Sequence, residues 1–258
     1  MPAYYTHHRF GADCLEVMPE PLRALAAGRR ELYEIGLHGP DVLFYHSAPI
    51  PGRVSALGSA LHRGSGADFF ARARLVWNTR PERDAMAAYL LGFLCHFLLD
   101  SACHARVNAA AGEHNRVEAV WDAAIMRREG LRPSRVLRGA EIVPSELNAL
   151  ITAPFFGLDG RTMLRCLRGQ VRTLRLLYSP RGVKKRLLRG AIRALRIPGG
   201  FDGLFIDDAL PPALEGDIAA LDALYAAALA EYPAMAEALS AYLAGEGELP
   251  ERFGRTFD

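Results

Sequence analysis

Three residues with metal-binding side chains recur at every fourth position of one apolar segment: His96, Asp100 and His104. On a helix each step of four residues advances about 40° around the axis, so the three side chains share one face. Leucines and phenylalanines surround them, and imidazoles and a carboxylate buried in such a setting need polar partners or a metal ion. The spacing therefore predicts a metal site on the face of a buried helix.

The two ends of this motif are too far apart to bind a single ion. At about 1.5 Å per residue, His96 and His104 are separated by about 12 Å along the helix axis. Bonds from a metal ion to imidazole nitrogen are only about 2 Å long. We therefore expect at least two metal ions, with Asp100 between them.

Other candidate ligands lie on both sides of this segment. His114 and Glu118 repeat the four-residue spacing on the next expected helix. Asp41 follows Gly-Pro in a turn-rich stretch that can present a carboxylate inward, and His62 comes shortly after a Gly-containing turn. These residues extend the predicted site beyond one helix.

All eight histidines of the chain lie at or before residue 114. This clustering favours one shared role in the N-terminal half. We expect His8, His38 and His46 beside the site or in solvent, and Cys103 as a small buried packing residue. For any single histidine, a hydrogen-bonded core residue is the competing interpretation.

Taken in order, these motifs resemble the bacterial zinc-dependent phospholipase C family, which is related in fold to single-strand-specific zinc nucleases. The resemblance spans roughly residues 3–125 and is carried by Tyr5-Thr6-His7, Gly39-Pro40-Asp41, Leu61-His62, the His96-to-His104 motif and His114-x3-Glu118. It implies an all-α fold and a trinuclear zinc site. The ligands it implies are His7, Asp41, His62, His96, Asp100, His104, His114 and Glu118.

The chain departs from this family at its start. In secreted members an N-terminal tryptophan ligates one zinc ion, whereas this sequence begins Met1-Pro2. Two zinc ions follow from the helix geometry, and the third, which would use His7, rests on the resemblance.

The resemblance implies hydrolysis of phosphoesters, with phospholipid as a substrate class. Asp41 is the catalytic candidate, because it can orient or deprotonate the attacking water in addition to binding metal. A nuclease or phosphomonoesterase with the same metals is one alternative. A non-catalytic, metal-stabilised homologue that binds lipids or partners is the other.

A second notable region is strongly basic. Residues 160–201 contain twelve Lys or Arg and no Asp or Glu. Steps of four and three form a cationic stripe of Arg161, Arg165, Arg168, Arg172 and Arg175, opposite an apolar stripe. The stripe fits a solvated helix face or a peripheral contact with anionic membrane. Nucleic acid is favoured less, because Tyr178 and Phe201 are the only aromatic residues in this region.

The overall pattern predicts one all-α domain over residues 1–258, with a metal-site half at 1–130 and a basic, Ala-rich half at 131–258. No segment alternates convincingly enough to be a strand. Segment 40–66, rich in proline and glycine, should be largely loop. Helices are expected at 19–36, 66–79, 81–108, 113–129, 161–177, 180–196 and 215–244, the last interrupted at Pro233.

Composition suggests the cellular setting. Half of the 258 residues are hydrophobic and the net charge is +2, which gives no global signal for polyanion binding. No secretory signal is visible, and the apolar run at 85–99 is too short to span a bilayer. We therefore expect a cytoplasmic protein, peripheral to membrane at most, whose four cysteines are free thiols.

Overall fold

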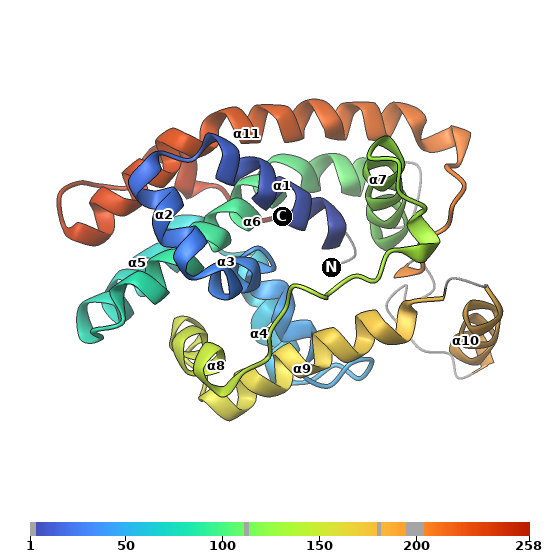
Figure 1. Ribbon diagram of the computed structural model, residues 1–258, viewed down its shortest axis with the longest axis horizontal. Coiled ribbons are helices and arrows are strands. Elements are labelled where there is room, and N and C mark those ends of the chain that lie inside the picture. Colours follow the sequence, from blue (N-terminus) through green and yellow to red (C-terminus); the bar gives the residue numbers. More distant parts are fainter. Residues whose placement is uncertain (1–3, 111–113, 180–181, 195–203) are drawn as a thin grey trace.

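The computed structural model describes residues 4–110, 114–179, 182–194 and 204–258. These residues are mostly helical, and their one pairing of extended backbone is an isolated antiparallel bridge between Ser65 and Thr256 (Figure 1). The all-α class predicted from the sequence is therefore confirmed. All four cysteines are free and buried.

The helices vary from one or two turns to more than eight. The α-helices are α1 Tyr4–Val17, α2 Glu20–Gly28, α3 Arg30–Gly36, α4 Arg53–His62, α5 Gly66–Thr79, α6 Arg83–Ala109, α7 His114–Arg128, α8 Glu146–Thr152, α9 Gly160–Leu177, α10 Val183–Ala194 and α11 Glu215–Ala244. Short 3-10 helices are η1 Gly39–Tyr45, η2 Pro133–Arg135, η3 Ala153–Phe156, η5 Pro212–Leu214 and η6 Glu251–Gly254.

Helix α6 forms the centre of the fold, and α1, α2, α3 and α11 pack against it. Among the described residues it alone has the length and hydropathy of a membrane span, but 83% of its most apolar window is buried inside the protein. A helix that is apolar on all sides and enclosed by other helices is a core helix. The ionisable residues of α6 are therefore buried by the packing of its neighbours.

Helices α3 and α6 meet at two glycines. A Cβ atom on Gly36 would lie 2.3 Å from the Tyr89 carbonyl oxygen, and one on Gly92 would lie 2.1 Å from the Tyr33 carbonyl oxygen. Only glycine permits this approach, because any side chain would overlap backbone atoms. The contact fixes the end of α3, and with it the segment that follows, against α6.

Two sequence-based expectations about helix boundaries were wrong. Segment 19–36 is divided into α2 and α3 at Arg29, and segment 40–66 contains η1 and the whole of α4. Pro49, Pro51 and Gly52 precede α4, whereas Pro40 lies in η1 and Gly58 within α4. Its first turn is fixed by Ser55, whose Oγ accepts a hydrogen bond from the Gly52 amide at 2.8 Å, as in one half of a capping box.

Helix α11 is continuous through Pro233, so the expected interruption was also wrong. A proline in a helix interior costs about 3 kcal/mol in lost hydrogen bonding and steric clash. Burial of Tyr232, Ala236 and Leu239 where α11 packs on α6 offsets that cost. The expected helices at 66–79 and 81–108 agree closely with α5 and α6.

Helix α9 confirms the predicted two-sided stripe. Asp159 caps its N-terminus by accepting the Thr162 amide at 2.7 Å. Gly169 lets the helix approach η1, since a Cβ there would lie 2.1 Å from the Tyr45 carbonyl oxygen. The apolar side is buried, and the exposed side carries Arg161, Arg165, Arg168, Arg172 and Arg175.

Candidate metal centre

The candidate ligands predicted from the sequence lie together at the centre of the molecule. Within the described residues, three groups place their ligand atoms within 4.8 Å of one another. The groups are His7 with His96 and Asp100, Asp41 with His62 and His96, and His104 with His114 and Glu118. Helices α1, α4, α6 and α7 and the 3-10 helix η1 supply them.

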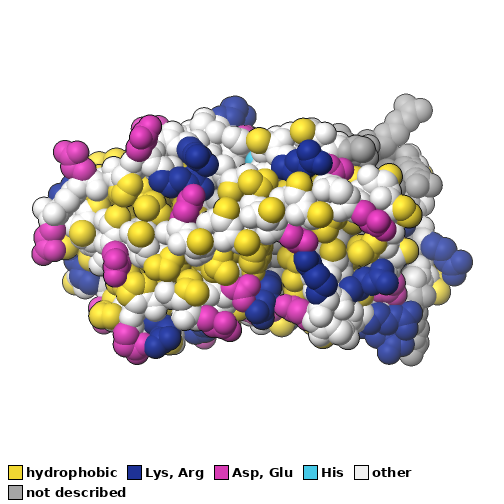
Figure 2. All heavy atoms as spheres, turned by 90° about the horizontal axis from the view of Figure 1, so that it is seen from above, with side chains coloured by type: hydrophobic (Ala, Val, Ile, Leu, Met, Phe, Trp, Pro, Cys, Tyr) yellow, Lys and Arg dark blue, Asp and Glu magenta, His cyan; other side chains and the backbone are white. Residues whose placement is uncertain are grey.

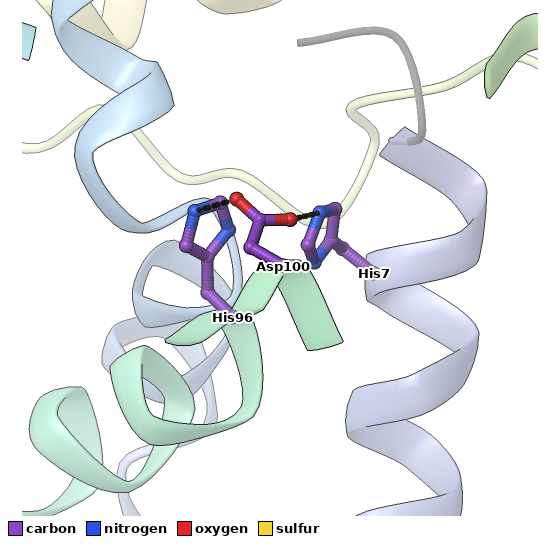
Figure 3. A group of neighbouring side chains, drawn as sticks. All are labelled: His7, His96 and Asp100. Atoms are coloured by element: carbon purple, nitrogen blue, oxygen red, sulfur yellow. Dashed lines mark ion pairs between the residues drawn. The ribbon is translucent and has the colours of Figure 1, made fainter. Parts of the chain in front are cut away.

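Asp100 occupies the middle of the site. Its Oδ2 lies 2.9 Å from His96 Nε2, and its Oδ1 lies 3.1 Å from His7 Nε2 and 3.7 Å from His104 Nε2. Figure 3 shows His7 on α1 and His96 on α6 pointing toward the carboxylate from opposite sides. Asp100 thus lies between the two ends of its own motif, as the helix spacing predicts.

Asp41 and His62 form the second group together with His96. His62 Nε2 lies 3.0 Å from Asp41 Oδ1 and 3.9 Å from Asp100 Oδ2. The turn before Asp41 requires glycine, because Gly39 has φ +43° and a Cβ there would lie 2.1 Å from the His96 ring. The Gly-Pro-Asp sequence therefore presents its carboxylate across the face of α6.

The third group joins α6 to α7. His104 Nε2 lies 3.6 Å from Glu118 Oε1, and His114 Nε2 lies 3.3 Å from Glu118 Oε2. Glu118 is 2% exposed, whereas the side chain of His114 is 36% exposed. This group therefore extends from the buried centre toward the surface.

Four of these histidines are oriented by a hydrogen bond at Nδ1, the ring nitrogen that faces away from Asp41, Asp100 and Glu118. The Nδ1 atoms of His96, His62 and His104 contact backbone carbonyl oxygens of Leu37, Gly58 and Phe257 at 3.2, 2.8 and 2.7 Å, and His114 Nδ1 contacts Asn108 Oδ1 at 2.7 Å. An oxygen acceptor at Nδ1 places the proton there and leaves Nε2 as a lone-pair donor. This arrangement is typical of histidine ligands to metal ions.

The carboxylates are held in their ionised form. Burial opposes ionisation of Asp100, but the charges of His104, His96 and His7 outweigh it and hold its pKa well below the usual range. Burial would likewise lower the pKa of His104, but Asp100 and Glu118 raise it to about 10. The cluster thus attracts protons, and a metal cation would replace those protons.

The distances fit a metal ion. Tetrahedral ligands bound at about 2.0 Å stand roughly 3.3 Å from one another, and the separations of Asp100 from His96, His7 and His104 are 2.9, 3.1 and 3.7 Å. Nε2 of His96 is buried and, among the described residues, makes no hydrogen bond. The donor set of imidazoles and carboxylates is the one that zinc prefers when no thiolate is present.

One part of the site comes from the far end of the sequence. Phe257 supplies the carbonyl oxygen that orients His104, and its amide donates to the His62 carbonyl oxygen at 3.2 Å. Its ring contacts His62 and His96, with centroids 6.0 and 6.1 Å apart. A backbone carbonyl leaves no signal in the sequence, so sequence reasoning missed this contact.

A cleft of about 690 Å³ opens beside the cluster. Asp41, His62, His104 and His114 form its inner side. Its other walls are the segment from Phe44 to Ser59, together with Arg63, Asn115, Leu204 and Asp258. The cleft therefore gives a bound molecule access to four of the eight candidate ligands.

The remaining histidines take other roles. His8 contacts Glu34 Oε2 through Nδ1 at 2.9 Å, and His38 stacks on Tyr4 with ring centroids 4.4 Å apart. His46 contacts the Ser47 hydroxyl at 2.8 Å. In these contacts none of the three histidines faces one of the candidate ligands.

The family to which the chain is similar is described by its dependence on zinc. The sequence model of a family described as zinc dependent phospholipase C matches residues 6–160. That span is more than half of the 258 residues and includes each candidate ligand from His7 to Glu118. Searches of curated proteins and of solved structures returned no match. Almost all of α9, all of α10 and Phe257 lie beyond the matched span.

Proposed function

The chain belongs to the zinc-dependent phospholipase C family, and we propose that it hydrolyses phosphoesters with zinc ions held around Asp100. One observation carries this proposal. His62, His96 and His104 turn Nε2 toward buried carboxylates while backbone carbonyl oxygens fix Nδ1. Such second contacts are unnecessary for packing and are characteristic of metal ligands.

We propose two zinc ions with a third available. One ion takes His104, His114 and Glu118. The other two groups both use His96, and one imidazole nitrogen binds one ion. His96 therefore binds an ion either with His7 and Asp100 or with Asp41 and His62. A third ion, bound by the group that lacks His96, needs another donor to replace that imidazole.

When bound, zinc supplies a Lewis acid that activates water and neutralises charge on phosphate oxygens. The protein's own groups position the reactants. Asp41 lines the cleft, and neighbouring positive charge outweighs burial and keeps its pKa well below the usual range, so it is ionised. We propose that Asp41 accepts a hydrogen bond from the attacking water and directs its lone pair at phosphorus, in addition to binding metal.

The cleft favours phospholipid as the substrate class. The cleft is also lined by Phe44, Pro49 and Ile50, and Ile50 is 72% exposed. An apolar wall beside a cationic metal cluster suits a molecule that joins a phosphate to an apolar glyceride. Arg63 at the mouth of the cleft adds a donor for phosphate oxygens.

Metal content gives the first test. Elemental analysis of purified protein should find two to three zinc per chain, and Asp100→Asn should lower that number. Asp84→Asn is the matched control, because Asp84 lies on the same helix but is exposed. A metal content near zero after expression with ample zinc would refute the proposal.

Substrate choice gives the second test. Zinc-loaded protein should release the phosphorylated head group from phosphatidylcholine and hydrolyse p-nitrophenylphosphorylcholine. Faster cleavage of single-stranded DNA or of a phosphomonoester would indicate the nuclease or phosphomonoesterase alternative. Zinc binding without turnover on the whole panel would indicate a metal-stabilised, non-catalytic homologue.

A further inference from the structure

Helix α10 exposes an apolar ridge. Val183 and Leu187 are 53% and 71% exposed, and Ala194 is also exposed. Their spacing of four and seven residues places them on one line along the helix. Lys184 and Arg186 flank this line on its two sides, so the ridge is bordered by cations.

The other side of α10 fastens it to the rest of the molecule. Lys185 forms an ion pair with Asp207, and Arg189 lies 3.3 Å from the same carboxylate. The Arg189 guanidinium also lies over the Phe205 ring, 5.4 Å from its centroid. These contacts point the apolar ridge away from the protein.

The cationic stripe of α9 continues this surface. Leu176, 51% exposed, adds an apolar residue at its C-terminal end beside the exposed Arg172 and Arg175. In the described part of the chain, neither arginine forms an ion pair. Lys184 links the two helices, because its Nζ donates to the carbonyl oxygens of Arg175 and Tyr178 at 3.0 and 3.1 Å.

The segment that anchors α10 also reaches the cleft. Phe205 and Asp207 contact α10, and the neighbouring Leu204 lines the cleft that contains the candidate metal ligands. Figure 1 places α10 at one end of the molecule and α5 at the other. Figure 2 shows Lys and Arg side chains gathered at the α10 end. The anchoring segment therefore links the α10 end of the molecule to the cleft.

We propose that the ridge of α10 and the adjoining cations of α9 form a docking surface for a bilayer containing anionic phospholipid. An apolar line bordered by basic residues is the pattern of a helix that lies in a membrane interface. Positive charge without acidic partners is complementary to anionic head groups, whereas a protein-packed helix would cover Leu187. The proposal goes beyond hydrolysis, since docking requires neither zinc nor turnover.

Nucleic acid is the competing occupant. Single strands bind through aromatic platforms set among basic residues. On this surface Tyr178 is partly buried and Phe205 is 3% exposed beneath Arg189. The exposed apolar groups are aliphatic instead, which favours lipid.

The test is cosedimentation of the zinc-loaded full chain with phosphatidylglycerol–phosphatidylcholine vesicles, compared with pure phosphatidylcholine. We expect tighter binding to the anionic vesicles than to pure phosphatidylcholine, and this difference should shrink as salt rises. Arg172→Gln with Arg175→Gln should weaken partitioning roughly 30-fold, about fivefold per charge. Leu187→Ser should weaken it roughly tenfold.

Leu75→Ser is the matched control. Leu75 is 68% exposed on α5, against 71% for Leu187, and lies at the opposite end of the molecule. Equal losses from the two leucine variants would overturn the proposal, as would tighter retention of single-stranded DNA than of vesicles. Hydrolysis of a soluble phosphodiester without vesicle binding overturns docking alone, and docking without hydrolysis overturns the proposed function alone.

Discussion

Helices α6 and α9 both carry ionisable side chains at helical spacing, in steps of four on α6 and of four and three on α9, but α6 buries its motif and α9 exposes its arginines. On α6, His96 and Asp100 are 0% and 4% exposed and face other ionisable groups. On α9 the arginines point into solvent. The same periodicity therefore produces a site for ions in one half and a surface in the other.

Solvation explains the difference. A buried carboxylate loses several kcal/mol of hydration unless a cation compensates it, so the cluster on α6 gains strongly when metal binds. An exposed arginine keeps its hydration and contributes little to folding. Substitutions in the two regions should consequently differ by orders of magnitude in effect.

The largest effect is expected at Asp100. Asp100→Asn removes the charge that faces His7, His96 and His104. We expect hydrolysis to fall at least roughly 100-fold and zinc affinity to fall with it. Steady-state rates of hydrolysis at saturating zinc measure this loss, with Asp84→Asn as the control. Unchanged rates for Asp100→Asn would show that Asp100 is not part of the site.

The second-largest effect is expected where Phe257, near the C-terminus, contacts His104. Truncation after Thr256 deletes the carbonyl oxygen of Phe257 that accepts from His104. Zinc affinity should fall roughly 10- to 100-fold, as for other losses of a second contact. Competition with a chelator measures it, and Asp258→Asn, which keeps the carbonyl, is the control. Equal affinities of the truncated and full chains would contradict a positioning role.

Asp122 lies where the metal-site half, residues 1–130, meets the half formed by residues 131–258. It accepts the Thr6 amide at 2.8 Å and lies 3.9 Å from Arg138, and burial outweighs these partners and raises its pKa to about 6. This pKa exceeds the value of about 3.9 in the unfolded chain. The contribution of the protonated Asp122 to the free energy of unfolding is therefore complete below pH 4 and is lost as pH rises through 6.

Ionisation of Asp122 should lower the free energy of unfolding by on the order of 2 kcal/mol between pH 4 and 6, and Asp122→Asn should remove this decrease. Urea unfolding at several pH values, with chelator present throughout, measures the difference from the unaltered chain. Parallel pH profiles for the two proteins would show that Asp122 does not titrate in this range.

The smallest effect is expected on α9. Arg168 is exposed and forms no ion pair within the described residues, so Arg168→Gln should change the unfolding free energy by less than about 0.5 kcal/mol. Turnover of a soluble phosphodiester should also stay unchanged. A loss comparable to that of Asp100→Asn would end the contrast between the two helices.

The sequence predicted what local periodicity determines. The shared face of His96, Asp100 and His104 follows from helical spacing alone, and so do the two stripes of α9. Start and stop signals were less informative, because the prolines before α4 mark its beginning, whereas Pro233 is tolerated within α11. Tertiary packing decides between these outcomes, and no local pattern records it.

Contacts between distant residues were beyond sequence reasoning. Phe257 and His104 are 153 positions apart, and their contact uses a backbone atom that every residue possesses. The division of the ligands into groups likewise depends on where α1, α4 and α7 pack against α6. The family resemblance identified the set of candidate ligands, but only the three-dimensional fold shows which of them lie next to one another.

The glycine contact between α3 and α6 has a consequence for the cost of reaction. Since Gly36 and Gly92 bring the two backbones together, no rotamer change can alter the spacing between the helices. The turn that carries Asp41 begins three residues after Gly36, and His96 lies four residues after Gly92. Both donors are thus preorganised, and little reorganisation energy is spent in bringing them to a charged substrate.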